Sequence, residues 1–129
     1  AQNLYDEGAD IVLPVAGPVG LGSASLANEL GADALMIIGV DADLYLTDPN
    51  NSHVYLTSVM KRMDSTVTEV ISRAVNGTFE GGIMVGTLEN GGVDLAPFHD
   101  MEARVPAELQ AELATVRAGI IDGSINVGE

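Results

Sequence analysis

Two apolar runs with a helical stretch between them constrain the fold of this chain more than any other feature. The run DIVLPVAG is apolar and contains β-branched residues, which is typical of a strand covered on both faces. The stretch SASLANEL favours a helix, with Ser23 or Ser25 as its predicted N-cap and Gly31 as its predicted end. The run ALMIIGVD predicts a second buried strand. A strand–helix–strand unit of this kind predicts two parallel strands.

The rest of the chain continues the same pattern. VYLTS is a predicted short strand, and SVMKRMDSTVTEVISRAVNG predicts a long helix over 58–76 because its apolar residues recur at spacings of three and four. GIMVGTL and GVDLAPF are predicted strands around the turn ENGG, and Pro106 begins a last helix that Gly123 ends. The predicted fold class is therefore α/β, a parallel sheet with flanking helices. Ligands of such folds bind at the carboxyl ends of the strands.

Composition excludes several classes of function. Five Lys and Arg stand against nineteen Asp and Glu, giving a net charge of -14, so nucleic acid and anionic lipid are excluded as main partners. Cysteine is absent, which excludes disulfides and thiol catalysis. His53 and His99 are isolated and no H-x-x-H pattern occurs, so no metal site and no cofactor are predicted. The chain opens on what looks like the end of a helix, so we expect it to be part of a longer protein.

Two candidate site features follow the two predicted strands. Asp41 and Asp43 come directly after the second strand, where a carboxylate is costly to desolvate unless metal, sugar hydroxyls, backbone amides or solvent compensate it. The glycine-rich turn from Gly17 to Gly22 follows the first strand. Small residues there let backbone amides approach a ligand, although a tight turn without a ligand explains the glycines equally well. Neighbouring parallel strands would bring Gly17 and Asp41 together.

The pair Asp41 and Asp43, and separately Lys61, each allow a further interpretation. A strand followed by D-x-D resembles the haloacid dehalogenase superfamily, in which Asp41 would be the nucleophile, Asp43 the acid/base and magnesium the bridge to phosphate. Tyr45 departs from that motif, which has Thr or Val there. Lys61 and Arg62 lie in the first turn of the predicted helix, where the dipole disfavours cations. Lys61 either meets a ligand or Asp41, or belongs to a solvated pair that neutralises nearby acids.

Four segments together resemble the basic membrane protein (BMP) family. They are GADIVLPVAGPVGLG, IIGVDADLY, YLTSVMKRMDSTV and GTLENGGVDLAPF, and the resemblance covers essentially all 129 residues in order. The family consists of substrate-binding lipoproteins of ABC transporters, of the two-lobed type I periplasmic-binding class. The resemblance implies that residues 1–45 and 92–129 belong to the C-terminal lobe and that 46–91 cross into the N-terminal lobe. It also implies that the main body of the N-terminal lobe is absent from this sequence.

The resemblance assigns roles to individual residues. Asp41 matches the acid that accepts hydrogen bonds from ribose 2′ and 3′ hydroxyls, and Gly17 matches a glycine that presents backbone to the ligand in the cleft. Lys61 matches a lysine that reaches the ligand from the opposing lobe. Asp43 matches a second acid with a structural or hinge-bridging role. Leu44 departs from the family, which usually has Gln at that position.

The resemblance therefore implies the substrate-binding component of an ABC importer and no enzyme. The implied ligand is a purine nucleoside, the implied partner is a permease, and the implied location is extracytoplasmic, either periplasmic or anchored to the membrane by a lipid upstream of this sequence. The apolar stripe of the predicted long helix also leads us to expect self-association of the 129-residue chain. Two alternatives are a magnesium-dependent phosphohydrolase and the effector-binding domain of a sugar-responsive transcription regulator.

Overall fold

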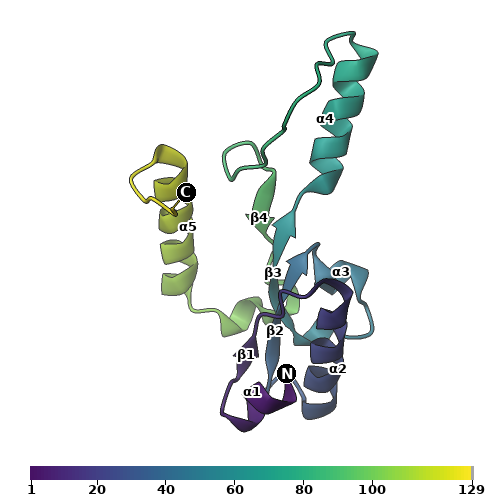
Figure 1. The fold of residues 1–129 in the computed structure, drawn as a ribbon. Helices are drawn as coiled ribbons and strands as arrows, with labels where there is room; N and C mark the ends of the chain where they lie inside the picture. Colours follow the sequence, from purple (N-terminus) through teal and green to yellow (C-terminus); the bar gives the residue numbers. More distant parts are fainter. Residues whose placement is uncertain (129) are drawn as a thin grey trace. The chain divides into compact units, whose positions relative to one another are not determined.

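Four strands of the chain form one parallel-dominated sheet, and the computed structural model describes residues 1–128. Its helices and strands are, in chain order, α1 (Gln2–Asp6), β1 (Ile11–Val12), α2 (Leu21–Leu30), β2 (Met36–Asp41), α3 (Leu44–Thr47), β3 (Tyr55–Lys61), α4 (Met63–Val75), β4 (Val93–Leu95) and α5 (Ala107–Asp122) (Figure 1). Short 3₁₀ helices lie at Gly17–Gly20, Ser52–Val54 and His99–Arg104. The strand order is β1-β2-β3-β4, and β2 pairs in parallel with both β1 and β3. The predicted α/β class is confirmed.

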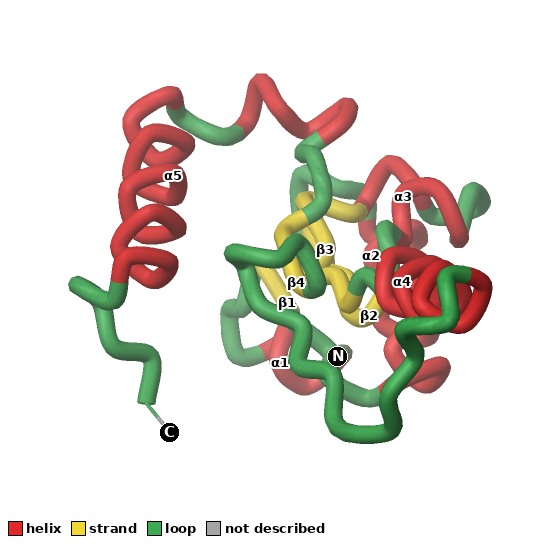
Figure 2. The backbone as a smooth tube through the Cα atoms, turned by 90° about the horizontal axis from the view of Figure 1, so that it is seen from above, coloured by secondary structure: helices red, strands yellow, loops and turns green. Residues whose placement is uncertain are grey.

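The predicted β1–α2–β2 unit is present, although only Ile11–Val12 of DIVLPVAG forms a strand. Small residues let its helix approach the sheet. Ala24 and Ala27 of α2 are fully buried, and α2 contacts β2. They belong to one core cluster with Val12, Leu35, Ile37, Val54 and Tyr55. Figure 2 shows the strands of this sheet side by side. Burial of these aliphatic side chains, at about 25 cal/mol per Å² of apolar surface, is the main force that holds the unit together.

Gly31 ends α2 as predicted, but the start of that helix differs from the prediction. The C-cap Gly31 has a φ of 90°, a conformation that side chains rarely adopt. The helix begins at Leu21, and Gly20 is its N-cap. Ser23 and Ser25 therefore lie inside the helix, and Ser25 Oγ donates to the carbonyl of Leu21 (3.1 Å) instead of capping.

The predicted helix over 58–76 is shorter at its start. Residues 58–61 belong to β3, and α4 begins at Met63. Ser58, Val59 and Met60 pair with Gly39, Val40 and Asp41 of β2, so tertiary pairing wins over the helical spacing of the apolar residues. The prediction of a strand at GIMVGTL is also wrong, because residues 82–88 form no regular strand. Of GVDLAPF, only Val93–Leu95 forms a strand.

The described chain divides into two compact units. Unit 1 comprises residues 1–60 and 95–105, and unit 2 comprises residues 61–94 and the part from Pro106 onward. The chain passes from one unit to the other at the end of β3, within β4 and between Val105 and Pro106. These boundaries differ from the predicted 1–45, 46–91 and 92–129, and the assignment of either unit to a lobe stays a prediction.

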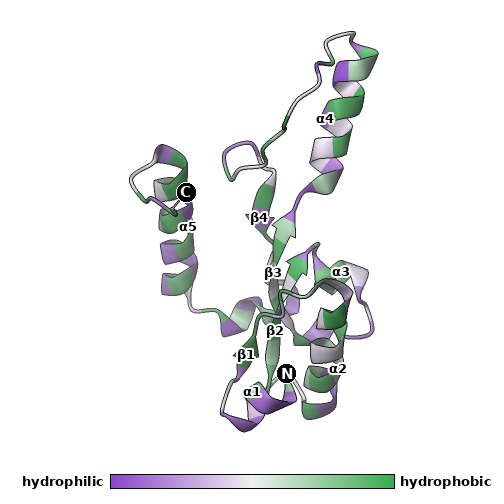
Figure 3. Cartoon of the chain, in the orientation of Figure 1, coloured by the Kyte–Doolittle hydropathy of each residue, from purple (hydrophilic) through white to green (hydrophobic). Residues whose placement is uncertain are grey.

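The long helix of unit 2 carries a stripe of exposed apolar side chains. Met63, Val67, Ile71 and Val75 follow one another at a spacing of four, and 56–80% of each is exposed. Figure 3 shows the hydrophobic residues along α4 in green. We refer to these four residues below as the α4 stripe.

Candidate functional site

β2 ends in a sharp turn at the first candidate residue. Asp41 is the last residue of β2, and its φ of 75° lies in the left-handed region, which is uncommon for a residue other than glycine. Asp41 is partly buried and lies in register with Met60 of β3. Asp43 precedes α3 as its N-cap residue. The turn therefore places the Asp41 carboxylate at the carboxyl end of a central parallel strand.

Gly17 lies at the same end of the neighbouring strand. It begins the 3₁₀ helix that follows β1, and this helix contacts β2. Its φ of 54° requires a glycine-like conformation, while nothing lies within 4 Å of the position that a Cβ would take. The backbone there is consequently open to approach. The structure thus brings Gly17 and Asp41 to the carboxyl ends of adjacent parallel strands, as the strand pattern predicted.

Lys61 lies elsewhere than the sequence pattern suggested. It is the exposed last residue of β3, two residues before α4 begins, so the predicted conflict with the helix dipole does not arise. It directly follows Met60, the β3 residue in register with Asp41. Lys61 belongs to unit 2, whereas Asp41 and Gly17 belong to unit 1. A shared role of Lys61 with the other two stays a prediction.

A cluster of polar and aromatic side chains surrounds Asp43. His99 Nε2 lies 2.8 Å from Asp43 Oδ2, and the rings of His99 and Tyr45 stack with centroids 4.0 Å apart and an interplanar angle of 10°. The Tyr45 hydroxyl donates to Asp100 Oδ2 (2.9 Å), and this hydrogen bond raises the pKa of the Tyr45 phenol. We refer to Asp43, Tyr45, His99 and Asp100 below as the His99 cluster. All four belong to unit 1.

Sequence reasoning missed most of this cluster. The sequence predicts a structural or hinge-bridging role for Asp43, but it shows His99 as an isolated histidine. His99 and Asp43 are 56 residues apart in the chain, and no local motif links them. Only the folded path of residues 95–105 back to unit 1 brings them together.

Neither a metal centre nor a membrane span is found in the described part of the chain. Residues 1–128 contain no group of three or more His, Cys, Asp or Glu side chains that could hold a metal ion. Within the same residues, no helix has both the length and the apolar character needed to cross a bilayer.

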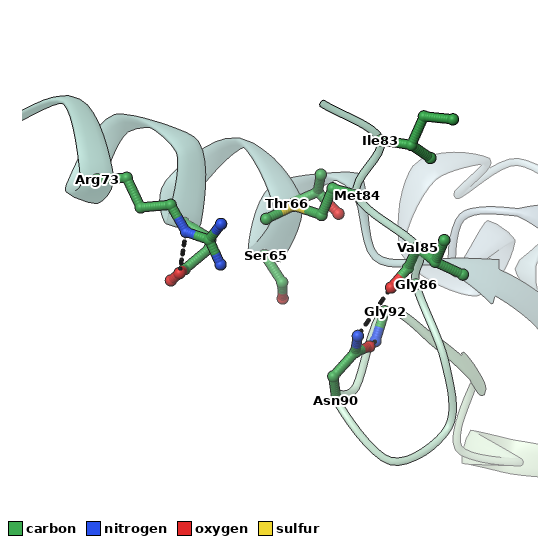
Figure 4. Close-up of a pocket in the computed structure, with 10 residues that line it drawn as sticks. Ser65, Thr66, Arg73, Ile83, Met84, Val85, Gly86, Asn90 and Gly92 are labelled. Atoms are coloured by element: carbon green, nitrogen blue, oxygen red, sulfur yellow. Dashed lines mark hydrogen bonds and ion pairs between the residues drawn. The ribbon is translucent and has the colours of Figure 1, made fainter. Parts of the chain in front are cut away.

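A cavity of about 580 Å³ lies within unit 2. Figure 4 shows it between α4 and the segment 83–92, lined by both. Several of its polar side chains bond one another or the backbone, because Arg73 pairs with Glu69 (2.7 Å) and Asn90 donates to the carbonyl of Val85 (2.8 Å). None of Gly17, Asp41 and Lys61 lines it. The turn after β2 is therefore the stronger candidate site.

Comparison with known proteins identifies the family to which the chain belongs. The family model of Bmp, described as ABC transporter substrate-binding protein PnrA-like, matches residues 1–129. The ABC transporter nucleoside-binding protein BmpA of Lactococcus lactis is 34% identical over 98% of this chain, and basic membrane protein A1 of Borrelia garinii is 33% identical over the same share. The chain spans 38% and 36% of the length of these two relatives.

Solved structures show the same fold. A solute-binding protein of an ABC transporter system from Conexibacter woesei superposes with a TM-score of 0.69 at 24% identity, over 98% of this chain and 40% of that one. A transcriptional activator of the comK gene from Bacillus halodurans superposes with a TM-score of 0.79 at 20% identity, over 98% and 42%. At these identities the likeness concerns the fold alone.

Proposed function

Because the chain belongs to the Bmp family of ABC transporter substrate-binding proteins, we propose that the full-length protein binds a purine nucleoside and presents it to an ABC permease. The name of the Lactococcus relative, a nucleoside-binding protein, supports the choice of ligand. The protein would work outside the cytoplasm, either in a periplasm or held at the membrane by a lipid anchor upstream of this sequence. Binding and release are its whole task, since the family consists of transport components and not of enzymes.

The position of Asp41 is the observation that carries this proposal. A carboxylate offers two acceptor oxygens, which suit the two neighbouring hydroxyls of a ribose. Asp41 lies at the carboxyl end of β2, the end at which α/β folds bind their ligands. The left-handed backbone at Asp41 is a further sign of function, because such conformations cluster at ligand sites.

The other predicted residues receive supporting roles. Gly17 would offer its open backbone to the ligand at the adjoining strand end. Lys61 would contact the ligand from the second lobe. Asp43 would act structurally, in keeping with its contact to His99.

The two alternatives lose support. The phosphohydrolase needs an enzyme family, whereas the family shown is one of transport components. The transcription regulator gains nothing from the structural neighbour named as a transcriptional activator, because 20% identity shows the fold alone.

Calorimetry on the full-length protein tests the proposal. Adenosine, inosine and guanosine are titrated together with their free bases and D-ribose as controls. We expect at least one nucleoside to bind more tightly than its free base or D-ribose, because base and ribose both contribute to the binding free energy of the nucleoside. Saturable binding of an unrelated solute, with no heat from any nucleoside, would contradict it.

A second assay addresses the phosphohydrolase directly. The full-length protein with magnesium should not turn over an aryl phosphate, because Tyr45 departs from the phosphatase motif. Turnover that disappears in Asp41→Asn would overturn the transport interpretation in favour of the enzyme.

A further inference from the structure

We infer that His99 is a positioning residue for Asp41: by holding Asp43 and Tyr45 it fixes the far side of the turn from which the Asp41 carboxylate projects. This inference rests on the proposed function in one respect, namely that Asp41 binds the ligand. The restraint that His99 places on the turn does not depend on any ligand, and amide hydrogen exchange measures it separately.

The turn needs to be held from both sides. On the near side, Asp41 is fixed by β2, which pairs in parallel with β3 up to the register position of Asp41 and Met60. Asp41 itself has a left-handed backbone, and such a conformation persists only where the surroundings impose it. Within residues 1–128, Asp41 and His99 are the only residues other than glycine with a positive φ. Both occur where the turn meets the His99 cluster.

On the far side, the hydrogen bond between His99 and Asp43 is the main restraint. An ionised carboxylate only accepts hydrogen bonds, so with Asp43 ionised the Nε2–H group of His99 is the donor and Asp43 Oδ2, 2.8 Å away, is the acceptor. The two side chains are 22% and 14% exposed, so solvent screens this contact little. Asp43 Oδ1 is buried and accepts no hydrogen bond from the described residues. Loss of the His99 donor would therefore leave a partly buried carboxylate poorly compensated, and the turn would rearrange to hydrate it.

Two further contacts extend the restraint into α3. The His99 ring stacks on Tyr45, and the backbone N–H of Leu44 donates to the buried Ser58 Oγ (3.2 Å). The Tyr45 hydroxyl in turn bonds Asp100, the neighbour of His99. Residues 43–45 are thus attached to β3 at one point and to the 3₁₀ helix His99–Arg104 at three. Only Ala42 separates Asp43 from Asp41 in the chain.

The 3₁₀ helix has a second anchor that is independent of the turn. Arg104 donates to the carbonyl of Ala32 (3.1 Å) and pairs with Asp33, both in unit 1. This anchor separates two roles of His99. If His99 merely attached the 3₁₀ helix, loss of Arg104 would disturb the same residues; if His99 positions the turn, only loss of His99 would.

The experiment compares four variants of the full-length protein. His99→Phe keeps a ring to stack on Tyr45 and removes the donor to Asp43, while His99→Gln retains an N–H donor. His53→Phe makes the same change at the exposed histidine, and Arg104→Gln removes the other anchor of the 3₁₀ helix. Amide hydrogen exchange of residues 41–45 reports the hold on the turn. The affinities for a nucleoside and for its 2′,3′-dideoxy analogue report the placement of Asp41.

We expect His99→Phe to speed exchange of residues 41–45 by about tenfold and to weaken the nucleoside by about tenfold, the scale of one lost hydrogen bond, without weakening the dideoxy analogue. His99→Gln should restore both quantities in part, and His53→Phe and Arg104→Gln should leave both near wild type.

An unchanged exchange rate of residues 41–45 in His99→Phe overturns the inference. If wild type binds the nucleoside more tightly than the dideoxy analogue, an equal loss of affinity for both ligands in His99→Phe overturns it too. Faster exchange in Arg104→Gln as well would also overturn it, because His99 would then be one of several attachments. If wild type binds both ligands equally, the proposed ribose contact of Asp41 fails, and exchange alone decides whether His99 holds the turn.

Discussion

At the scale of single residues, the backbone at Asp41 is unusual for a reason that can be tested. Its φ of 75° costs about 1 kcal/mol or more for a residue with a side chain, and glycine would not bear this cost. Asp41→Gly should therefore leave the free energy of unfolding unchanged or raise it by up to about 1 kcal/mol, while nucleoside binding is lost. Chemical denaturation and calorimetry on the same variant measure the two effects.

Ala42→Gly is the matched control for that prediction. Ala42 does not have a positive φ, so glycine there gains no relief of strain and should destabilise by about 0.5–1 kcal/mol. If Asp41→Gly destabilises as much as Ala42→Gly, the strain at Asp41 has been overestimated.

A second prediction at this scale concerns Tyr55 and alkaline pH. Burial, together with the hydrogen bond that the phenol donates to Asp48 Oδ2 (2.7 Å), raises the pKa of Tyr55 above its usual value. The folded state thus holds this proton more tightly than the unfolded state. The resulting stability is fully present below the usual pKa of about 10 and is lost as pH rises toward the folded pKa, at up to about 1.4 kcal/mol per pH unit.

Urea unfolding between neutral and alkaline pH checks the Tyr55 prediction. Tyr55→Phe should be less stable than wild type at neutral pH, and the difference should shrink above pH of about 10. Tyr5→Phe keeps the Tyr55–Asp48 bond and should follow wild type. A constant difference between Tyr55→Phe and wild type across this range would refute the linkage.

At the scale of elements, Gly39 controls the fit of α3 against the sheet. A Cβ at Gly39 would collide with Ser58 Oγ and lie 2.9 Å from Leu44 Cδ1. Gly39→Ala should therefore destabilise by about 1–3 kcal/mol through overpacking. Gly22→Ala is the control, because Gly22 lies in α2 with nothing within 4 Å of its Cβ position, and alanine favours a helix by up to about 1 kcal/mol. Equal stabilities of the two variants would show that α3 can shift away from Gly39 at little cost in free energy.

The elements also show which parts of the fold could be predicted from sequence. The unit β1–α2–β2 was predictable because its apolar runs, its helix and Gly31 all indicate the same structure. The start of α4 was not, because the apolar residues 59, 60 and 63 fit a helix as well as a strand, and only pairing with β2 decides between them. Residues 82–88 have strand-forming side chains, yet they form no regular strand in the described chain.

At the scale of the whole molecule, the candidate site was predictable only where it depends on one strand–helix–strand unit. Gly17 and Asp41 follow two neighbouring strands, so the topology alone brings them to one end of the sheet. His99 reaches Asp43 from the other end of the sequence, through a segment that returns to unit 1 between two parts of unit 2. Such a long-range contact leaves no periodic signal in the sequence.

The α4 stripe leads to a prediction for the isolated 129-residue chain. Val67, Ile71 and Val75 are 56%, 57% and 80% exposed, and contiguous apolar surface of this kind promotes association. We expect light scattering after size exclusion to give a mass above the 13.3 kDa of one chain. The double variant Val67→Glu/Ile71→Glu should lower it, while Thr68→Glu/Ser72→Glu, which adds the same charges beside the stripe, should not. A monomeric wild-type chain would contradict this prediction.

The central claim is that Asp41 binds the ribose of a nucleoside, and isothermal titration calorimetry of the full-length protein tests it most directly. Wild type and Asp41→Ala are each titrated with a nucleoside and with its 2′,3′-dideoxy analogue. Each charge-assisted hydrogen bond to a hydroxyl contributes about 1.5–3 kcal/mol, so Asp41→Ala should weaken the nucleoside by about one to several powers of ten. The dideoxy analogue should bind wild type poorly and lose little more in the variant. Equal affinities of wild type for the two ligands would contradict the account.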